Sequence, residues 1–306
     1  MKTSVRRWQG HSGRLLDTVN DYDVIDCSVC GFKHVVPIPD EDDLKRYYAE
    51  KFIPERPLYM VRMEEDLEWW NTVYDDRYDF LEKCLPRTRR RILDIGCGIG
   101  NFLRRGRERG WECLGIEPSK DAASYARDWG LDVINSCLDE ARLEGPAFDA
   151  IHVSEVLEHI PAPVEFLEKA HGLLHDGGVI CVVVPNDYSP IQRLLREILD
   201  FKPYWIAPPQ HINYFSFDSL ERLLKRVGFH ILKKTAMFPM DLFLVMGDNY
   251  VGNDQLGRAC HEKRKRLDIM LNEPWLKGFK DDMYELMAKH GIGREIILYG
   301  RKDGAR

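Results

Sequence analysis

The sequence lacks a long hydrophobic run, an internal repeat and a low-complexity tract. No apolar stretch approaches the roughly 18–20 residues that are needed to cross a bilayer. The start, MKTSVRRWQGHSGR, has basic residues but no apolar stretch behind them, so we expect no signal peptide. The eight cysteines are scattered, and Cys97 and Cys181 lie in apolar runs, which is typical of a reducing cytoplasm rather than a disulfide framework. We therefore expect a cytoplasmic protein.

An excess of positive charge is also missing. The 44 Lys and Arg residues are outnumbered by 50 Asp and Glu residues, and the net charge of −6 argues against a broad nucleic-acid-binding surface. Two local basic clusters, at 104–110 and 261–266, are expected to be solvated helix faces. The 306 residues, 44% of them hydrophobic, can form one large domain or a medium domain with appendages.

The chain from about residue 90 alternates short apolar runs with amphipathic segments, which predicts repeated βα units and a parallel sheet. The predicted strands cover 91–96, 112–117, 131–135, 148–154, 178–185, 230–237 and 294–302. One predicted helix begins at Asn101, and three others cover 119–129, 163–174 and 216–229. Ser216 or Asp218 is expected to cap the last helix, with Gly228 after its end.

Segments that break this rhythm suggest four parts. They are an amino-terminal knuckle and helical lid segment (1–85), a cofactor-binding Rossmann-like core (86–237), a helical insert over the substrate site (238–293), and the last core strand with a tail (294–306). A shorter interruption covers 186–211. Because ligands of such sheets bind at the carboxyl ends of the strands, both late insertions are placed to cover a site.

The most informative stretch is ILDIGCGIGNFL, in which a strand runs into a glycine-rich turn and then a helix. Glycines let the backbone approach a ligand closely, as in nicotinamide and flavin enzymes. Here the third glycine of the dinucleotide pattern is replaced by Asn101. Asp94 in the strand disfavours a pyrophosphate but suits a ligand with a cationic amine and a sulfonium, namely S-adenosyl-L-methionine. Glu117, at the end of the second strand, could bind both ribose hydroxyls, although such a residue taken alone could be a solvated acid.

Four successive motifs resemble those of class I S-adenosylmethionine-dependent methyltransferases over about residues 88–235. They are LDIGCGIGNFL, GIEPS, FDAIHVSEVLEHI and LLHDGGVICVVVPN. The resemblance implies a Rossmann-like α/β fold with a seven-stranded, mostly parallel sheet, whose last strand, REIILYGRK, is antiparallel. It also implies a cofactor site in which Asp94, Gly96 and Gly98 line the methionine moiety, Glu117 holds the ribose, Leu138 flanks the adenine and Ser154 faces the methyl donor. Cys97 and Gly100 of the same turn are expected to bind the cofactor too.

EVLEHIPAP follows the fourth strand and places Glu155, Glu158 and His159 at helical spacing, which predicts that they share one face. The stretch resembles the E-x-x-E-H motif of small-RNA 3′-end methyltransferases and ubiquinone-pathway O-methyltransferases. In the former a second histidine lies downstream, and His211 in PPQHINYFSFDSL has a similar place.

These four residues allow two interpretations. Two carboxylates and two imidazoles could hold Mg²⁺, Mn²⁺ or Zn²⁺ and leave positions open for substrate oxygens. Alternatively, many methyltransferases of this class carry V-L-E-H at this place without metal. His159 or His211 would then act as a base, position the substrate or support the loop.

Cys27-x-x-Cys30-Gly has the shape of a zinc knuckle, but no second C-x-x-C exists. His11 and His34 could complete four ligands at an irregular spacing. The segment resembles the zinc-binding lead-in of some bacterial methyltransferases, with the first cysteine pair missing. A degenerate knuckle without metal is the preferred interpretation, and a structural zinc is the alternative. The aromatic residues of the next predicted helix, 64–85, are expected to pack in the core, and some of them to roof the substrate pocket.

The favoured function is methyl transfer to a hydroxyl oxygen of a small molecule, such as a glycan precursor, a quinone-like phenol or a secondary metabolite. One alternative is an RNA-modifying ribose O-methyltransferase, which the E-x-x-E-H resemblance suggests. The other is a non-catalytic partner protein that binds S-adenosylmethionine. Nothing in the sequence determines the oligomeric state.

Overall fold

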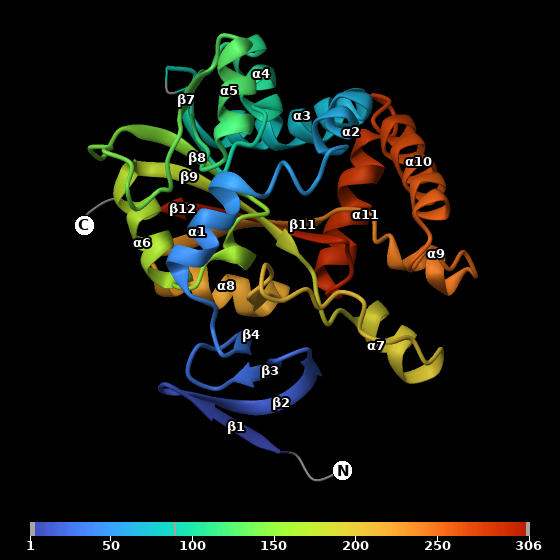
Figure 1. Cartoon of the computed structure of the whole chain (residues 1–306). Coiled ribbons are helices and arrows are strands. Elements are labelled where there is room, and N and C mark those ends of the chain that lie inside the picture. Colours follow the sequence, from blue (N-terminus) through green and yellow to red (C-terminus); the bar gives the residue numbers. More distant parts are fainter. Residues whose placement is uncertain (1–3, 89, 304–306) are drawn as a thin grey trace.

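Two β-sheets organise the protein (Figure 1). The computed structural model describes residues 4–88 and 90–303. A five-stranded sheet contains the amino-terminal strands and one short strand from late in the chain, and a seven-stranded sheet forms the body. None of the helices in the described ranges combines the length and apolarity that a bilayer crossing needs.

The large sheet confirms the predicted strands and their direction. Its order is β11 (Phe229–Ala236), β12 (Glu295–Lys302), β9 (Leu174–Pro185), β8 (Phe148–Ser154), β5 (Arg91–Ile95), β6 (Glu112–Ile116) and β7 (Asp132–Ile134). The strands from β5 to β9 pair in parallel, and β12 is antiparallel to both of its neighbours. Only the bounds of β9 differ noticeably from the prediction, because this strand begins at Leu174, four residues before the predicted start at 178.

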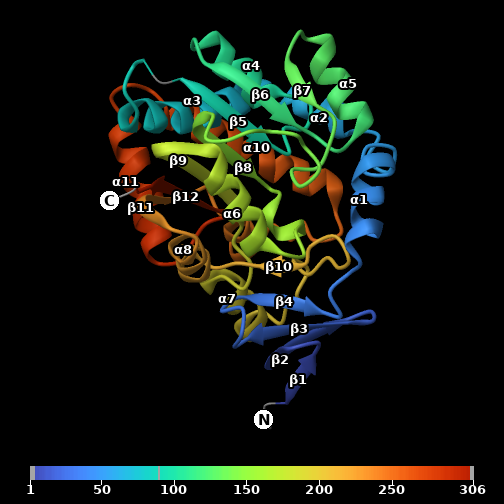
Figure 2. The same cartoon turned by 90° about the vertical axis from the view of Figure 1, so that its left-hand side faces the viewer.

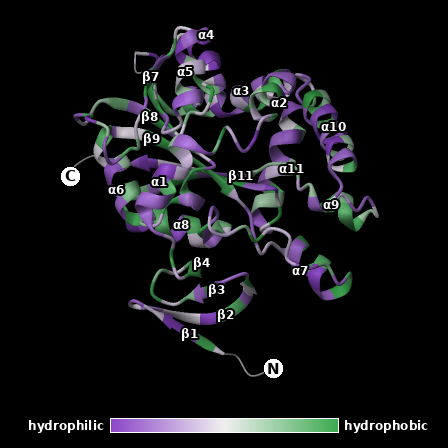
Figure 3. Cartoon of the chain, viewed as in Figure 1, coloured by the Kyte–Doolittle hydropathy of each residue, from purple (hydrophilic) through white to green (hydrophobic). Residues whose placement is uncertain are grey.

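Helices cover both faces of this sheet and thereby bury it. The continuous apolar run of β9 sends alternate side chains into two separate cores, as expected for a strand buried on both faces. On one face lie α6 (Pro163–Leu173) and α8 (Phe217–Arg226), and on the other lie α3 (Leu67–Cys84) and α4 (Asn101–Glu108). Helix α5 (Lys120–Asp128) packs against β7. The outer helices carry hydrophilic and hydrophobic stripes (Figure 3).

Local capping signals agree with the helix ends. The Ser216 side chain accepts a hydrogen bond from Ser219 N at the start of α8, so Ser216 and not Asp218 is the N-cap. Gly228, with φ +102°, follows the C-cap residue Val227.

The small sheet was missed by the sequence analysis, which predicts only a knuckle at this place. It contains β1 (Val5–Trp8), β2 (His11–Val19), β3 (Tyr22–Cys27), β4 (Lys33–Val36) and β10 (Asn213–Tyr214). All of its pairs are antiparallel, and β10 reaches it from beyond α7 (Pro190–Ile198). In Figure 2, β10 lies between β4 and the body of the molecule. Helices α1 (Glu41–Glu50) and α2 (Tyr59–Glu65) then lead to α3.

Three helices, α9 (Asp241–Val245), α10 (Asp254–Leu271) and α11 (Lys277–Lys289), lie between β11 and β12. Asp66, which is 6% exposed, attaches α10 to the start of α3. Its carboxylate accepts hydrogen bonds from Arg258 (2.7 Å), Lys265 (2.5 Å) and His261 (3.0 Å). Burial alone would raise the pKa of Asp66, but these bonds hold it well below its usual range.

The expectation that the basic clusters are solvated helix faces is only partly correct, since Arg107, Lys263 and Arg266 are exposed but other members are not. In 261–266, Arg264 and Lys265 are buried, and Lys265 pairs with Asp66. In 104–110, Arg105 and Arg109 both pair with Asp75 on α3, at 2.7 and 2.9 Å. The acidic side chains of neighbouring helices therefore neutralise much of both clusters.

Replacing Asp66 by alanine should lower the free energy of unfolding by about 2–4 kcal/mol, because it leaves buried cations without their anion. Denaturant unfolding would measure the loss. Glu65→Ala is the matched control: Glu65 pairs with the same Arg258 but is exposed, so its loss should cost under about 1 kcal/mol. Equal effects of the two changes would contradict the anchoring role of Asp66.

Candidate active site

The glycine-rich turn after β5 is compact because two of its glycines lie against other segments. Gly96 has φ +74°, and a Cβ there would lie 2.4 Å from Val156 Cγ2. Gly98 has φ +55°, and a Cβ there would lie 3.0 Å from the Tyr59 hydroxyl. The turn therefore touches both the loop after β8 and the start of α2, and side chains at these positions would push them apart.

Cys97, in the middle of the turn, contributes its backbone rather than its thiol. Its sulfur lies where a Cβ on Gly115 would meet it at 2.6 Å, so the side chain faces the core. The amides of Gly96 and Cys97 donate to Ile116 O, at 2.8 and 3.0 Å. These bonds fix the turn to the end of β6.

Glu117, at the end of β6, binds this same turn. Its Oε2 accepts a hydrogen bond from Gly98 N and its Oε1 one from Ser119 N, both at 2.8 Å. Burial raises the pKa of Glu117 to about 7, although the two backbone amides oppose the shift. The solvated-acid interpretation of Glu117 is therefore wrong, since its side chain is buried between two strand ends.

Asp94 is oriented by two residues that the sequence analysis missed. His152 is its cross-strand neighbour on β8, and His152 Nδ1 lies 2.7 Å from Asp94 Oδ1. On the other side of the ring, Arg77 on α3 lies 2.9 Å from His152 Nε2. Because a guanidinium only donates, Nε2 accepts, and Nδ1 donates its proton to Asp94. A histidine inside the apolar strand FDAIHVS was the available signal.

This chain of hydrogen bonds is buried and reaches the next predicted site residue. Asp94, His152 and Arg77 are each at most 3% exposed, and burial lowers the pKa of His152. Phe102 stacks on the imidazole with ring centroids 3.8 Å apart. Arg77 also donates to Ser154 Oγ at 3.3 Å, so one guanidinium contacts two side chains of β8 and reaches Asp94 on β5 through His152.

Two further placements concern Leu138 and the aromatic residues beside the glycine turn. Leu138 follows β7 and is 5% exposed within the hydrophobic core. Tyr59, Phe52 and Tyr125 pack around Ile99 of the glycine turn, which the sequence analysis did not foresee. Burial is the main cause that raises the pKa of Tyr59 above its usual value, and the carboxyl groups of Glu117 and Glu155 raise it further.

The prediction that Glu155 shares a helical face with Glu158 and His159 is wrong. Glu155 has φ +53°, and the turn that follows is a 3₁₀-helix, Leu157–His159. A left-handed residue before a three-residue turn breaks the helical spacing. Burial and the neighbouring Glu295 raise the pKa of Glu155 to about 7.

The other three members of the predicted cluster do come together. One ligand atom from each of Glu158, His159 and His211 lies within 4.8 Å of the others. The His159 and His211 rings are 4.9 Å apart, and Glu158 Oε1 is 3.7 Å from His159 Nε2. The backbone joins them too, since Ile212 N donates to Glu158 O at 2.8 Å.

The polar atoms of this cluster are available for chemistry. Within the described ranges, Glu158 Oε2 and His211 Nδ1 are buried without a hydrogen-bond partner. His159 Nδ1 lies 2.8 Å from both Gln210 O and the Tyr48 hydroxyl. Because Gln210 O can only accept, this nitrogen carries the proton and Nε2 offers a lone pair. Burial lowers the pKa of His159 to about 4 and that of His211 to about 3, which keeps both neutral at pH 7. The cluster can therefore accept a proton or bind a cation.

A second group of possible metal ligands lies in the small sheet. It consists of Cys27, Cys30, His11 and His34, whose ligand atoms all lie within 4.8 Å of one another. The structure thus brings the two histidines, at their irregular spacing, to the cysteine pair.

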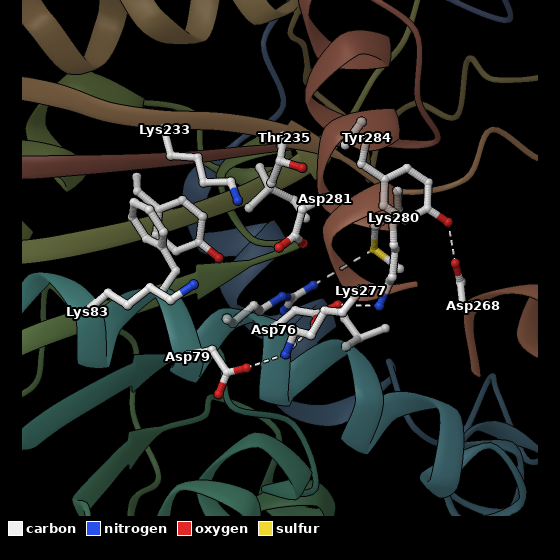
Figure 4. A pocket seen from close by; sticks show the side chains of 17 residues that line it. Asp76, Asp79, Lys83, Lys233, Thr235, Asp268, Lys277, Lys280, Asp281 and Tyr284 are labelled. Atoms are coloured by element: carbon white, nitrogen blue, oxygen red, sulfur yellow. Dashed lines mark hydrogen bonds and ion pairs between the residues drawn. The ribbon is translucent and has the colours of Figure 1, made fainter. Parts of the chain in front are cut away.

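A small cavity between α3, α11 and β11 is not part of the active site (Figure 4). Its volume is about 60 Å³, and ion pairs such as Lys280–Asp76 and Lys277–Asp79 cross its wall. Neither Asp94 nor Glu117 lines it. Several of its charged side chains are paired within the protein, and we treat the cavity as a packing feature.

Comparison with known proteins identifies the family. The family model described as "Methyltransferase domain" matches residues 66–234, more than half of the chain. A ubiquinone biosynthesis O-methyltransferase from Caulobacter vibrioides is 31% identical over 127 residues, or 39% of this chain and 50% of that protein. A trans-aconitate 2-methyltransferase from Mycolicibacterium gilvum is also 31% identical, over 40% of this chain and 49% of that protein. The chain thus spans about half the length of these relatives.

Solved structures share the fold at low sequence identity. An S-adenosylmethionine-dependent methyltransferase from Archaeoglobus fulgidus superposes with a TM-score of 0.52 at 19% identity, over 80% of this chain and 99% of that one. The plantazolicin methyltransferase in complex with SAH gives a TM-score of 0.53 at 14% identity, over 85% and 94%. Together with the matched domain and the seven-stranded sheet, these findings show that the chain belongs to the class I S-adenosylmethionine-dependent methyltransferases.

Proposed function

We propose that this enzyme transfers the methyl group of S-adenosylmethionine to a hydroxyl oxygen of a small molecule. The observation that carries the proposal is the group of Glu158 and His159, just after β8, and His211, just before β10. Within the described residues, Glu158 Oε2 and His211 Nδ1 are buried without a hydrogen-bond partner. The similarity to ubiquinone biosynthesis O-methyltransferases supports a hydroxyl acceptor. A glycan precursor, a quinone-like phenol or a secondary metabolite would provide one.

The cofactor would be held at the carboxyl ends of β5 and β6. Asp94, fixed by His152, offers a carboxylate to the cationic amine, and the backbone of the glycine turn lines the methionine moiety. Glu117 would exchange its present bond to Gly98 for the ribose hydroxyls. Leu138 is assigned to the adenine, and Ser154 to the surroundings of the methyl group.

Replacing Glu117 by alanine should weaken binding of S-adenosylhomocysteine roughly 100-fold, because hydrogen bonds to a charged group contribute about 1.5–3 kcal/mol each. Isothermal titration calorimetry would measure the change. Glu112→Ala on the same strand is the control, because Glu112 is exposed and pairs only with Arg91 at the far end of β6. An unchanged affinity in Glu117→Ala would refute the ribose assignment.

The three-residue cluster would act on the acceptor hydroxyl. His159 presents Nε2, and its Nδ1–H is held by Gln210 O, which fixes the ring for accepting a proton or for binding a cation. One carboxylate and two imidazoles fit Zn²⁺, Mn²⁺ or Mg²⁺ and leave positions open. A divalent cation bound there supplies a Lewis acid that lowers the pKa of the hydroxyl. Glu158, whose Oε2 has no hydrogen-bond partner among the residues that the structure describes, would compensate the positive charge.

The chemistry of the neighbouring groups supports a neutral acceptor. Burial would lower the pKa of Arg294, but Asp187, Asp241, Glu295 and Glu155 hold it above its usual value. Four carboxyl groups thus surround one guanidinium at this edge of the sheet. An anionic acceptor would be repelled there, whereas a hydroxyl compound could use these groups as hydrogen-bond partners.

The RNA-modifying alternative gains little from the structure. Arginines and lysines in both basic clusters form ion pairs within the protein, so the clusters do not offer a free track for phosphates. Incubating cell extract with radiolabelled cofactor and identifying the product would decide between the alternatives. A labelled small molecule would support the proposal, and labelled RNA with salt-sensitive binding would overturn it. Tight cofactor binding without any labelled product would favour the non-catalytic alternative.

We expect methyl transfer to depend on a divalent cation that is bound by Glu158, His159 and His211. EDTA should abolish turnover, and Mg²⁺ or Mn²⁺ should restore it. His211→Ala should need more metal for the same rate, and His159→Ala should lose at least about 100-fold in rate, because a ligand or base that contacts the reacting group is removed. His230→Ala, a change of an exposed histidine on β11, is the control and should remain fully active.

Two other outcomes would revise this mechanism. If turnover is insensitive to chelators while His159→Ala is inactive, His159 acts as a base without metal. If His159→Ala and His211→Ala both stay fully active, the cluster has only a structural role.

A further inference from the structure

The small sheet brings four side chains with soft or borderline metal-binding atoms to one point. His11 begins β2, Cys27 ends β3, Cys30 lies in the following turn and His34 lies on β4. His11 Nδ1 is 3.2 Å from Cys30 Sγ and 3.8 Å from Cys27 Sγ. Sulfur and nitrogen ligands of one tetrahedral zinc ion lie roughly 3.5 Å apart, so the side chains are already at coordination distance.

The turn between the cysteines has the backbone of a metal knuckle. Cys30 N points at Cys27 Sγ at 3.5 Å, and Gly31 N donates to Cys27 O at 3.0 Å. Gly31 then takes φ +79°, which turns the chain back toward β4. An amide aimed at a sulfur stabilises a thiolate, the form of cysteine that binds metals.

His34 supplies an independent observation that points to a ligand. The residue is 1% exposed, and its Nδ1 lies 2.9 Å from Val35 O, so this nitrogen carries the proton. Its Nε2 is therefore a lone pair, and it is buried without a partner in the part of the chain that is described. Metal-binding histidines are typically held in this way, by a backbone carbonyl on the far nitrogen.

We propose that His11, Cys27, Cys30 and His34 bind one zinc ion in a closed, tetrahedral Cys₂His₂ site. All four positions are filled by the protein, which is typical of structural and not catalytic zinc. Two thiolates balance the charge of Zn²⁺, so the site is neutral and suits its partly buried place. The metal joins β2, β3 and β4 on the side of the sheet where the hydrophobic cluster is small.

The zinc site is connected to the turn that carries Glu158 and His159. His34 on β4 pairs with Asn213 on β10, and Val35 N donates to Ile212 O at 3.0 Å. Asn213 Nδ2 then donates to Leu157 O (3.0 Å) and Ile160 O (2.8 Å), on either side of Glu158. The metal therefore fixes the strand that follows His211. This second part rests on the proposed function of the cluster, whereas the metal site itself does not.

Metal analysis of the purified full-length protein tests the site. We expect about one zinc per chain, and a tetrahedral cobalt spectrum with a thiolate charge-transfer band after exchange with Co²⁺. Cys30→Ser should lower the zinc content at least about tenfold, and His34→Ala should weaken zinc binding in the same direction. Cys84→Ser, a partly buried free cysteine on α3, is the matched control and should keep its zinc.

The wild-type protein decides the question even if a variant fails to fold. Wild-type protein that contains no zinc and does not bind added Zn²⁺ or Co²⁺ would overturn the proposal. Retained zinc in Cys30→Ser and His34→Ala would also overturn the assignment of the ligands.

Hydrogen exchange tests the connection to the active site. Amides of 211–214 should exchange at least about tenfold faster in Cys30→Ser than in Cys84→Ser, because the pairing of β4 with β10 loosens. Unchanged exchange in a zinc-free variant would overturn the connection and leave the metal site intact. Zinc-loaded protein without methyl transfer would count against the proposed function alone, and active protein without any zinc would count against this inference alone.

Discussion

The hydrogen bond between Asp94 and His152 is the contact on which the geometry of the candidate active site depends. It joins the adjacent strands β5 and β8 near their carboxyl ends, where the glycine turn and the Glu158 turn begin. Arg77 completes the chain from α3, so a helix on one face of the sheet controls the orientation of a carboxylate at its edge. Because all three groups are buried, rotation of any one of them would leave a polar atom unpaired in a dry environment.

Burial governs the protonation of the groups that surround this contact. Enclosure by protein raises the pKa values of Glu117 and Glu155 to about 7 and lowers those of His159 and His211 to about 4 and 3. The site is thus rich in ionisable groups that are held near or in their neutral forms at pH 7. Such a site is prepared for a cationic cofactor and for proton transfer, because the charges that would compensate arrive with the ligands.

The two sheets form a continuous structure because one chain segment belongs to both regions. Residues 211–214 carry a cluster histidine, bond the Glu158 turn and add the fifth strand to the small sheet. The amino-terminal sheet is therefore more than an appendage to the cofactor-binding core. The stability of this sheet, whether it comes from packing or from a bound metal, affects how rigidly His211 is positioned.

The amino-acid sequence by itself determined the core of this protein. Strands, helices and the order of the motifs depend on local periodicity and on short runs such as LDIGCGIGNFL, so the parallel βα core and Asp94 and Glu117 as candidates follow from the residues. The number of strands in the sheet and its antiparallel last strand were implied by the resemblance to class I methyltransferases, and the structure confirms them. The alternation of buried runs and amphipathic segments extends over the whole core, which leaves little freedom in the fold.

Only the tertiary structure decided which distant residues meet. The Arg77–His152–Asp94 chain, the enclosure of Glu117 and the convergence of His11 and His34 on the cysteine pair all join positions that no local pattern links. Glu155 is the opposite case. Its spacing along the sequence predicts a helical face shared with Glu158 and His159, but its left-handed backbone breaks the helix, and Glu155 has Glu295 as its neighbour instead. Long-range contacts depend on how strands pair and helices pack, and these relations are set by the whole fold rather than by spacing along the chain.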